Sequence, residues 1–153
     1  MRNMQRWLGD GGMPLIEAVG AQFDGYGTSE SGMAFAEAGW RPTALACNPH
    51  GTVQGGVHGV LLDAAMNFAV NVGLEAPDRT RASLEMKTET MRPARAEDLL
   101  RVRGEVVRMA RQVAYAEARV TDAAGSLLSR ATATFLLHRA PRAVDEGQGR
   151  QRG

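Results

Sequence analysis

Residues 55–72 read GGVHGVLLDAAMNFAVNV, the most apolar stretch of the chain with helical character. From Val57 to Val72, apolar side chains occur on nearly every face of the predicted helix. A helix that is hydrophobic all round belongs inside a protein core. At a rise of 1.5 Å per residue it would be roughly 25 Å long, about the diameter of a small domain. Pro77 and Asp78 mark the end of this stretch.

The sequence on either side of this helix predicts strands. A short helix is expected at 14–19, where Pro14 stands in the first turn. Between 21 and 47 the pattern is mixed, with strands favoured at 33–40 and 41–47 and an interruption at Pro42. Further strands are expected at 83–91, 99–109, 113–122 and 126–138, with a hairpin turn at 122–125. We therefore expect an α+β fold in which a strongly curved antiparallel sheet wraps around one long central helix, its last four strands forming a meander.

Length and composition restrict the class of protein. The chain has 153 residues, 44% hydrophobic and 23% charged, which suits one globular domain. We expect a loosely held lead-in at 1–13, the domain at 14–138 and a disordered tail at 139–153. A net charge of +1 argues against nucleic acid as a partner, and one cysteine with three histidines argues against a disulfide framework or a zinc site. No apolar run is long enough for a membrane span and no signal-peptide core is present, so a cytoplasmic protein is expected.

Asp63 is the most informative residue, because it lies in the middle of the apolar helix. Aspartate is rarely buried unless it is paired or functional, and an unpaired buried carboxylate has a raised pKa. Two structural explanations stay open: this part of the helix faces solvent, or Asn67, one turn later, binds the carboxylate. The spacing favours a functional carboxylate over these alternatives.

Gly55 and Gly56 stand directly before the predicted helix. Backbone N–H groups at a helix start, with no side chains in the way, can bind an oxyanion, although a simple tight turn needs the same residues. Asn48 and Gln54 flank this loop, and each amide can bind a substrate carbonyl, orient a water, or cap the turn or helix. Ser83 opens the strand that follows the helix.

The string from Asn48 to Asp63 resembles the signature of hotdog-fold acyl-CoA thioesterases of the PaaI type. That pattern is Asn, six residues to His-Gly-Gly, and then Asp nine residues after the His. Here Asn48, the Gly-Gly pair and Asp63 fall in register, and Gln54 stands where the family has histidine. The strand that begins at Ser83 also resembles the family, which often has Ser or Thr near the carboxylate. The resemblance extends over about residues 14–138.

The resemblance implies hydrolysis of an acyl- or aryl-CoA thioester without a cofactor or metal. The N–H of Gly55 would stabilise the oxyanion, and Asp63 would act as general base or nucleophile. Asn48 or Gln54 would position the substrate or a water, and Ser83 would hold the water or Asp63. Arg108 and Arg111 are candidates for binding the CoA phosphates. The family also implies a homodimer, and a dimer of dimers, with each active site shared: Asn48, Gln54 and Gly55 from one subunit, Asp63 and Ser83 from the other.

Three other functions are compatible with parts of this pattern. A non-catalytic acyl-CoA-binding hotdog module is the main alternative, since it would keep the fold and the pocket. A hotdog dehydratase would need a catalytic histidine paired with an acid, and no histidine has a matching position. A purely structural homo-oligomer would not need Asp63 inside the helix.

Overall fold

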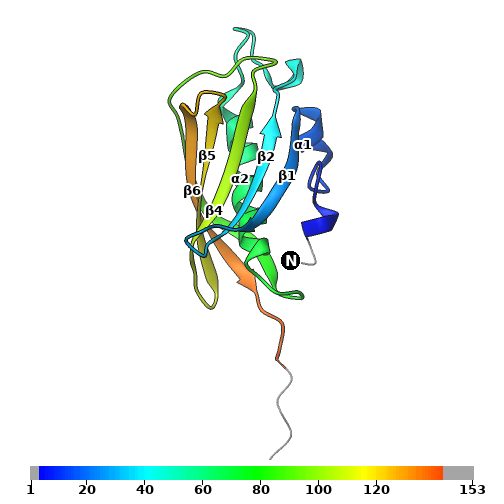
Figure 1. Ribbon diagram of the computed structural model, residues 1–153, viewed down its shortest axis with the longest axis vertical. Coiled ribbons are helices and arrows are strands. Elements are labelled where there is room, and N and C mark those ends of the chain that lie inside the picture. Colours follow the sequence, from blue (N-terminus) through cyan, green and yellow to red (C-terminus); the bar gives the residue numbers. More distant parts are fainter. Residues whose placement is uncertain (1–3, 143–153) are drawn as a thin grey trace, which may run out of the picture.

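The computed structural model describes residues 4–142 and consists of one long helix against a curved six-stranded antiparallel sheet (Figure 1). The helices are α1 (Pro14–Ala18) and α2 (Gly55–Val72), with single 3₁₀ turns at Met4–Arg6 and Ala44–Ala46. The strands are β1 (Ala21–Thr28), β2 (Ala34–Trp40), β3 (Arg79–Thr90), β4 (Leu100–Met109), β5 (Val113–Asp122) and β6 (Leu127–His138). The predicted fold class is confirmed, and α2 begins two residues earlier than the apolar pattern suggested.

The strand order is β1-β2-β4-β5-β6-β3, so the predicted meander of the last four strands is wrong for β3. Strands β4, β5 and β6 do form a meander, but β3 pairs with β6 at one edge of the sheet. The side chains explain the difference. Leu100, Val102 and Val106 of β4 are buried and suit an interior strand, whereas nearly every position of β3 is exposed.

The region 21–47 differs from the prediction in two ways. Residues 21–28 form β1, an edge strand that its glycines concealed in the sequence. Its register with β2 shifts between Phe23 and Gly25, which is where a bulge interrupts the alternation. The second strand predicted at 41–47 is absent from the described chain, because Pro42 follows the end of β2 and residues 44–46 form a 3₁₀ turn instead.

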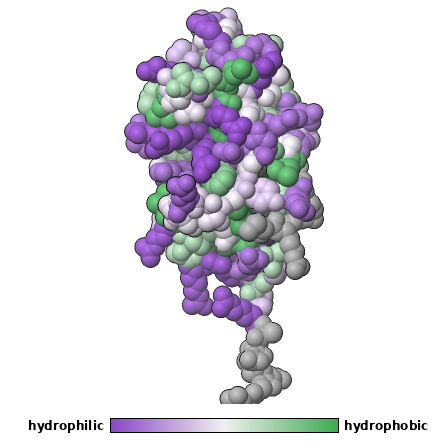
Figure 2. Space-filling model, in the orientation of Figure 1, coloured by the Kyte–Doolittle hydropathy of each residue, from purple (hydrophilic) through white to green (hydrophobic). Residues whose placement is uncertain are grey.

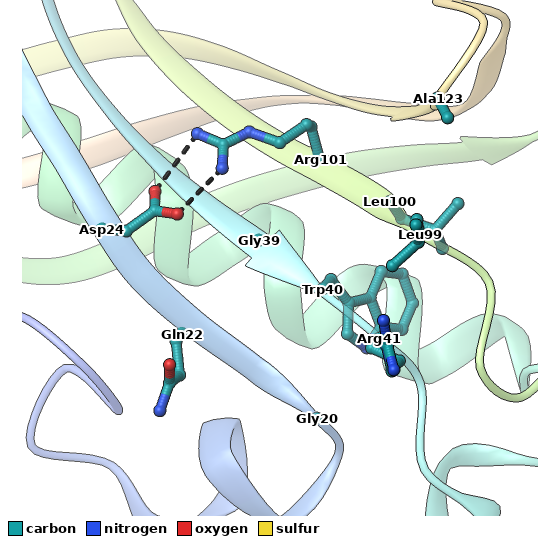
Figure 3. A pocket seen from close by; sticks show the side chains of 10 residues that line it. All are labelled: Gly20, Gln22, Asp24, Gly39, Trp40, Arg41, Leu99, Leu100, Arg101 and Ala123. Carbon is teal, nitrogen blue, oxygen red and sulfur yellow. Dashed lines mark hydrogen bonds and ion pairs between the residues drawn. The ribbon is translucent and has the colours of Figure 1, made fainter.

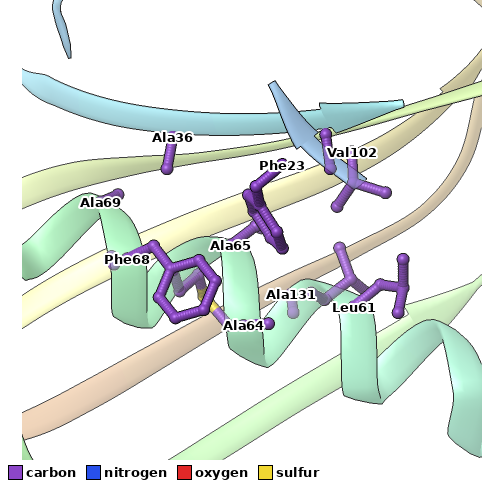
Figure 4. Close-up of a cluster of buried hydrophobic side chains, with 14 of the residues drawn as sticks. Phe23, Ala36, Leu61, Ala64, Ala65, Phe68, Ala69, Val102 and Ala131 are labelled. Atoms are coloured by element: carbon purple, nitrogen blue, oxygen red, sulfur yellow. The ribbon is translucent and has the colours of Figure 1, made fainter. Parts of the chain in front are cut away.

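The core lies between α2 and the inner face of the sheet (Figure 4). Leu61, Ala65 and Phe68 of α2 are buried there, with Phe23 packing edge-on against Phe68. Gly104 of β4 is the point of closest approach. A Cβ at this position would collide with the carbonyl group of Ala65, so only glycine lets the β4 backbone lie directly against α2.

The segment before α1 is not loosely held over residues 4–12, which corrects the prediction for the lead-in. Met4 is buried, Trp7 stacks on Phe68 with ring centroids 5.5 Å apart, and Gly9 pairs with Phe23. At the other end, Arg139 and Ala140 both bind the Asp78 carboxylate. The rest of the predicted tail, 143–153, lies outside the described residues.

The turn between β5 and β6 is confirmed. Gly125 has φ +82°, the left-handed conformation that favours glycine, and the Asp122 carboxylate accepts hydrogen bonds from the N–H groups of Ala124 and Ser126. Across residues 4–142, neither helix combines the length and the apolar character that crossing a bilayer requires.

Candidate active site

One stripe of α2 is not covered by the sheet. Gly56, Val60, Asp63 and Asn67 follow each other at intervals of three or four residues, so they share one face of the helix. Gly56 is exposed and the other three are half-buried, while most of the remaining α2 residues are buried. Asp63 therefore lies at the boundary between the core and an open face.

Two bulges in β3 turn Ser83 toward this stripe. The register with β6 shifts between Thr80 and Ala82 and again between Ser83 and Glu85. Ser83 consequently pairs with Phe135 and Met86 with Ala133, two buried residues of the inner face. In a regular strand Ser83 and Met86, three residues apart, would lie on opposite faces, but the bulge between Ser83 and Glu85 reverses the alternation and puts them on the same face.

Ser83 and Asp63 are in contact across the two elements. The Ser83 hydroxyl donates a hydrogen bond to Asp63 Oδ1 over 3.4 Å. Burial raises the pKa of the Asp63 carboxyl above its ordinary range, and the hydrogen bond from Ser83 offsets part of that rise. A carboxylate with a raised pKa is a stronger base than a solvated one, which suits proton abstraction.

Asn67 does not bind Asp63, so one of the structural alternatives for this carboxylate is excluded. The Asn67 Oδ1 atom instead accepts hydrogen bonds from Thr80 Oγ1, at 2.6 Å, and from Asn71 Nδ2, at 3.0 Å. The second alternative, exposure of the helix, holds only in part because Asp63 is half-buried.

A groove of about 350 Å³ lies between α2 and β3, and we call it the α2–β3 groove. Its lining comes from one helix face and from β3: Gly55, Gly56, Gly59, Val60 and Asp63, with Met86 and Thr88. The first N–H groups of a helix have no partner within it. A Cβ at Gly55 or Gly56 would meet nothing within 4 Å, so the approach to these N–H groups is open. The groove thus combines a basic carboxylate with a helix N-terminus suited to a developing negative charge.

Gly55 and Asp63 are far apart within one chain. Eight residues separate them, which is about 12 Å along the axis of an α-helix. A carbonyl oxygen bound to the Gly55 N–H lies within about 3 Å of it, beyond the N-terminal end of the helix. One chain therefore does not bring both groups to the same carbonyl.

Asn48 and Gln54 have different surroundings. The Asn48 side chain closes its own turn, because Oδ1 accepts from the His50 N–H at 2.9 Å and Nδ2 donates to Thr52 Oγ1 at 3.0 Å. Gln54 is exposed at the N-cap position of α2, and within the described chain its side chain does not cap the helix. The structure brings Gln54 to the end of the groove and gives Asn48 the turn-closing role.

Arg108 and Arg111 lie at the other end of the molecule. The turn after β4 is next to the C-terminal end of α2, where Gly73 approaches the side chain of Met109. The 18 residues of α2 span about 27 Å, so both arginines are far from Gly55 of the same chain. The Arg111 carbonyl accepts a hydrogen bond from Arg139. Within residues 4–142 of one chain, these arginines do not lie at the α2–β3 groove.

His58 is the fourth residue of α2, and its side chain is buried. Its Nδ1 atom is 2.8 Å from the Ser129 hydroxyl, and its ring packs edge-on against Trp40. The Nδ1 atom is therefore satisfied by Ser129, whereas Nε2 is buried and has no partner among the described residues. Burial lowers the pKa of His58, so the ring is neutral and does not add charge to the helix N-terminus.

A second cavity, of about 470 Å³, lies on the outer face of the sheet (Figure 3). Asp24 and Arg101 close one side of it with two hydrogen bonds, and Trp40 and Leu99 contribute apolar surface. Figure 2 shows that hydrophilic side chains dominate the visible face of the molecule, with small hydrophobic areas between them. The carboxylate in this cavity is engaged by an arginine, so the α2–β3 groove is the better candidate for catalysis.

The sequence profile of the thioesterase superfamily matches residues 50–129, which is just over half of the chain and includes the whole α2–β3 groove. The chain belongs to the thioesterase superfamily. Thioester hydrolysis is the general reaction of the family. No curated protein sequence matches the chain significantly.

The solved structures that are similar to this chain support its hotdog fold. A phenylacetic acid degradation-related protein from Ralstonia eutropha JMP134 is 27% identical, with a TM-score of 0.69 over 81% of this chain and 89% of that one. A mutant of the phenylacetic acid degradation protein PaaI from Thermus thermophilus is 24% identical, with a TM-score of 0.68 over 80% and 97% of the chains. A thioesterase from Haemophilus influenzae is 17% identical and has a TM-score of 0.72 over 81% and 82%. These similarities agree with the predicted resemblance to PaaI-type thioesterases.

Proposed function

We propose that this protein hydrolyses an acyl- or aryl-CoA thioester to the free acid and CoA. The observation that carries the proposal is the half-buried Asp63 carboxylate, held by Ser83 and facing a groove that begins at the open N-terminus of α2. A structural protein would have no use for a partly desolvated charge on its central helix, because such a charge costs stability.

Two chemical routes are compatible with this geometry. In the first, Asp63 takes a proton from a water while the water oxygen forms a bond to the thioester carbon. In the second, the carboxylate oxygen attacks that carbon and the resulting anhydride is hydrolysed. In both routes the carbonyl oxygen becomes negative, the C–S bond then breaks, and the CoA sulfur leaves and takes up a proton. The N–H of Gly55 would stabilise the oxyanion, Ser83 would orient Asp63, and Gln54 would position the thioester.

The proposed active site is shared between two chains. Since Gly55 and Asp63 of one chain are about 12 Å apart along α2, a second chain is needed to bring a Gly55 N–H to the carbonyl at Asp63. Strand β3 lies at one edge of the sheet. Its outer edge has no partner within the described residues of the single chain. Leu84 and Met86 on this strand are 54% and 41% exposed, which favours burial by another copy. We therefore propose a homodimer joined at β3, with dimers pairing further.

A panel of acyl- and aryl-CoA thioesters tests the proposed function directly. The purified protein is mixed with each thioester, and free CoA thiol is measured over time, with Asp63→Asn as the matched control. Release of thiol by the wild type and not by the variant is the expected result. Tight binding of acyl-CoA without release would instead favour the non-catalytic acyl-CoA-binding module.

A further inference from the structure

A chain of hydrogen bonds fixes which way the amide of Asn67 points. The backbone N–H of Thr80 can only donate, and it donates to Asn71 Oδ1 at 3.1 Å. The other end of the Asn71 amide is therefore its NH₂ group, which donates to Asn67 Oδ1 at 3.0 Å. The Thr80 hydroxyl also donates to this oxygen, at 2.6 Å. The Asn67 oxygen is thus turned toward β3 and the core, and its NH₂ group points away from them.

The Asn67 NH₂ group has no hydrogen-bond partner in the described part of the chain. It is not buried either, because His58 Nε2 is the only buried side-chain polar atom of the described residues that lacks a partner. Asn67 follows Asp63 by four residues on the uncovered stripe of α2, so their Cβ atoms are about 5–6 Å apart. A free donor therefore lies one helical turn beyond the carboxylate.

The two ends of this stripe differ in accessibility. Gly55 and Gly56 are exposed at one end, whereas Asn71 is 3% exposed at the other. The CoA part of a thioester is large and charged, and it must reach solvent. The groove lining reaches Asp63, and beyond it the stripe continues through half-buried Asn67 to buried Asn71, so this less accessible end suits the acyl group.

We propose that Asn67 is a specificity-determining residue whose NH₂ group donates a hydrogen bond to an acceptor in the acyl group. This inference rests on the proposed thioesterase function, with the thioester carbon next to Asp63. The substrate class is a short acyl chain that carries a carbonyl or ether oxygen about 6 Å from the thioester carbon, the spacing of neighbouring turns on a helix face. A purely apolar chain would cover the Asn67 NH₂ group and leave it without a partner, which is unfavourable.

A matched pair of substrates tests this assignment. The 5-oxohexanoyl and 5-methylhexanoyl thioesters of CoA have nearly the same shape, but only the first has an acceptor near its end. We expect the wild type to prefer the ketone by about tenfold in kcat/KM, the scale of one hydrogen bond whose donor is otherwise desolvated. Asn67→Asp keeps the oxygen that Thr80 and Asn71 bind and replaces the free NH₂ group by a second oxygen. The preference should disappear in Asn67→Asp and in Asn67→Leu.

Thr80→Val is the control. It removes the hydroxyl that donates to Asn67 Oδ1 and accepts from Asn71 Nδ2. The backbone N–H of residue 80 still donates to Asn71 Oδ1, and Asn71 Nδ2 still donates to Asn67 Oδ1, so the preference for the ketone should persist even if the melting temperature falls. Equal kcat/KM values for the two substrates in the wild type would overturn the role of Asn67 and leave the thioesterase function intact. If Asn67→Asp lowers kcat/KM equally for both substrates, the acceptor lies in the CoA part of the substrate. That result would also overturn the role of Asn67 in recognising the acyl group. If no thioester of any kind is hydrolysed, the proposed function itself fails.

Discussion

The Ser83 hydroxyl donates to Asp63 Oδ1 over 3.4 Å, and this contact joins the edge strand β3 to the central helix α2. Both residues lie on the side of the molecule where the sheet ends; Asp63 lines the α2–β3 groove, and Ser83 contacts it from the edge strand. The pair exists because a bulge in β3 turns Ser83 inward. The carboxylate, its hydrogen-bond donor and the free strand edge are therefore parts of one region.

Asp63→Asn should lower kcat by about 10³-fold or more, because it keeps the shape of the side chain and removes the base or nucleophile. The fold should be at least as stable as the wild type. Burial raises the pKa of Asp63 in the folded protein, so the folded state holds its proton at pH values where the unfolded chain has lost it. Ionisation at neutral pH then costs stability, and the neutral amide avoids that cost. Thiol-release kinetics and thermal denaturation measure both effects; full activity in the variant would refute the mechanism.

Ser83→Ala should lower kcat/KM less than Asp63→Asn does, by about tenfold, the scale of a hydrogen bond to a charged group. The hydrogen bond from Ser83 lowers the pKa of Asp63, so its loss should move the acid limb of the pH–rate profile to higher pH. A profile of kcat/KM against pH for both proteins checks this. A loss as large as that of Asp63→Asn, with no shift of the limb, would assign Ser83 a direct part in bond making.

A mixture of two inactive variants should regain activity if the site is shared. A bulky residue at Gly55 would block the oxyanion site without disturbing its own chain, since a Cβ there meets nothing within 4 Å. Asp63→Asn and Gly55→Leu are mixed in equal amounts and allowed to exchange subunits. A mixed dimer has one site with both defects and one with neither, so about a quarter of wild-type activity should return. Native mass spectrometry verifies the exchange, and exchange without activity would exclude the shared site.

Gln54→His should retain activity within a few-fold, because Gln54 is exposed at the N-cap and its side chain makes no capping hydrogen bond in the described chain. Histidine is also the residue that PaaI-type sequences have at this place. Steady-state kinetics on the preferred thioester measure the effect. A collapse of kcat with unchanged melting temperature would show that the Gln54 amide positions the thioester in a way that histidine cannot replace.

Stability should fall as the pH decreases below 6.5, and His58 should account for part of that fall. Burial lowers the pKa of His58 from 6.5 in the folded state, so the unfolded chain binds a proton at pH values where the folded chain does not. The double variant His58→Leu/Ser129→Ala lacks this difference and should show a shallower decline. Melting temperatures across this pH range measure it, with Ser129→Ala as the control that keeps the histidine. Parallel curves for the wild type and the double variant would rule out a contribution from His58.

The parts of the fold that were predictable are those with a clear apolar period. The stretch 57–72 could only be a buried helix, and the alternation in 99–109, 113–122 and 126–138 gave three strands with nearly correct bounds. Asp63 could be singled out from the sequence because a carboxylate is rare within so apolar a helix. These signals are local, and the structure agrees with them.

The rest depends on contacts between distant segments. Glycines concealed β1. The position of β3 beside β6 goes with how little of β3 is buried compared with β4 and β5, which the alternation within one strand does not show. The bulges that turn Ser83 inward leave no mark in the sequence. The sequence presented Asn67 as a possible partner of Asp63, because spacing alone does not reveal that Thr80 and Asn71 already bind its oxygen.

The absence of a side chain at Gly104 also restricts how α2 can move. The β4 backbone lies against the backbone of α2 at Ala65, so a slide of the helix along its own axis would press bulkier residues into that contact. Translation of α2 relative to the sheet is therefore blocked, while the side chains on its uncovered stripe keep their freedom to change rotamer. If the groove binds the proposed thioester, its exchange would then require movements of side chains or of the strand edge, with the helix itself remaining stationary.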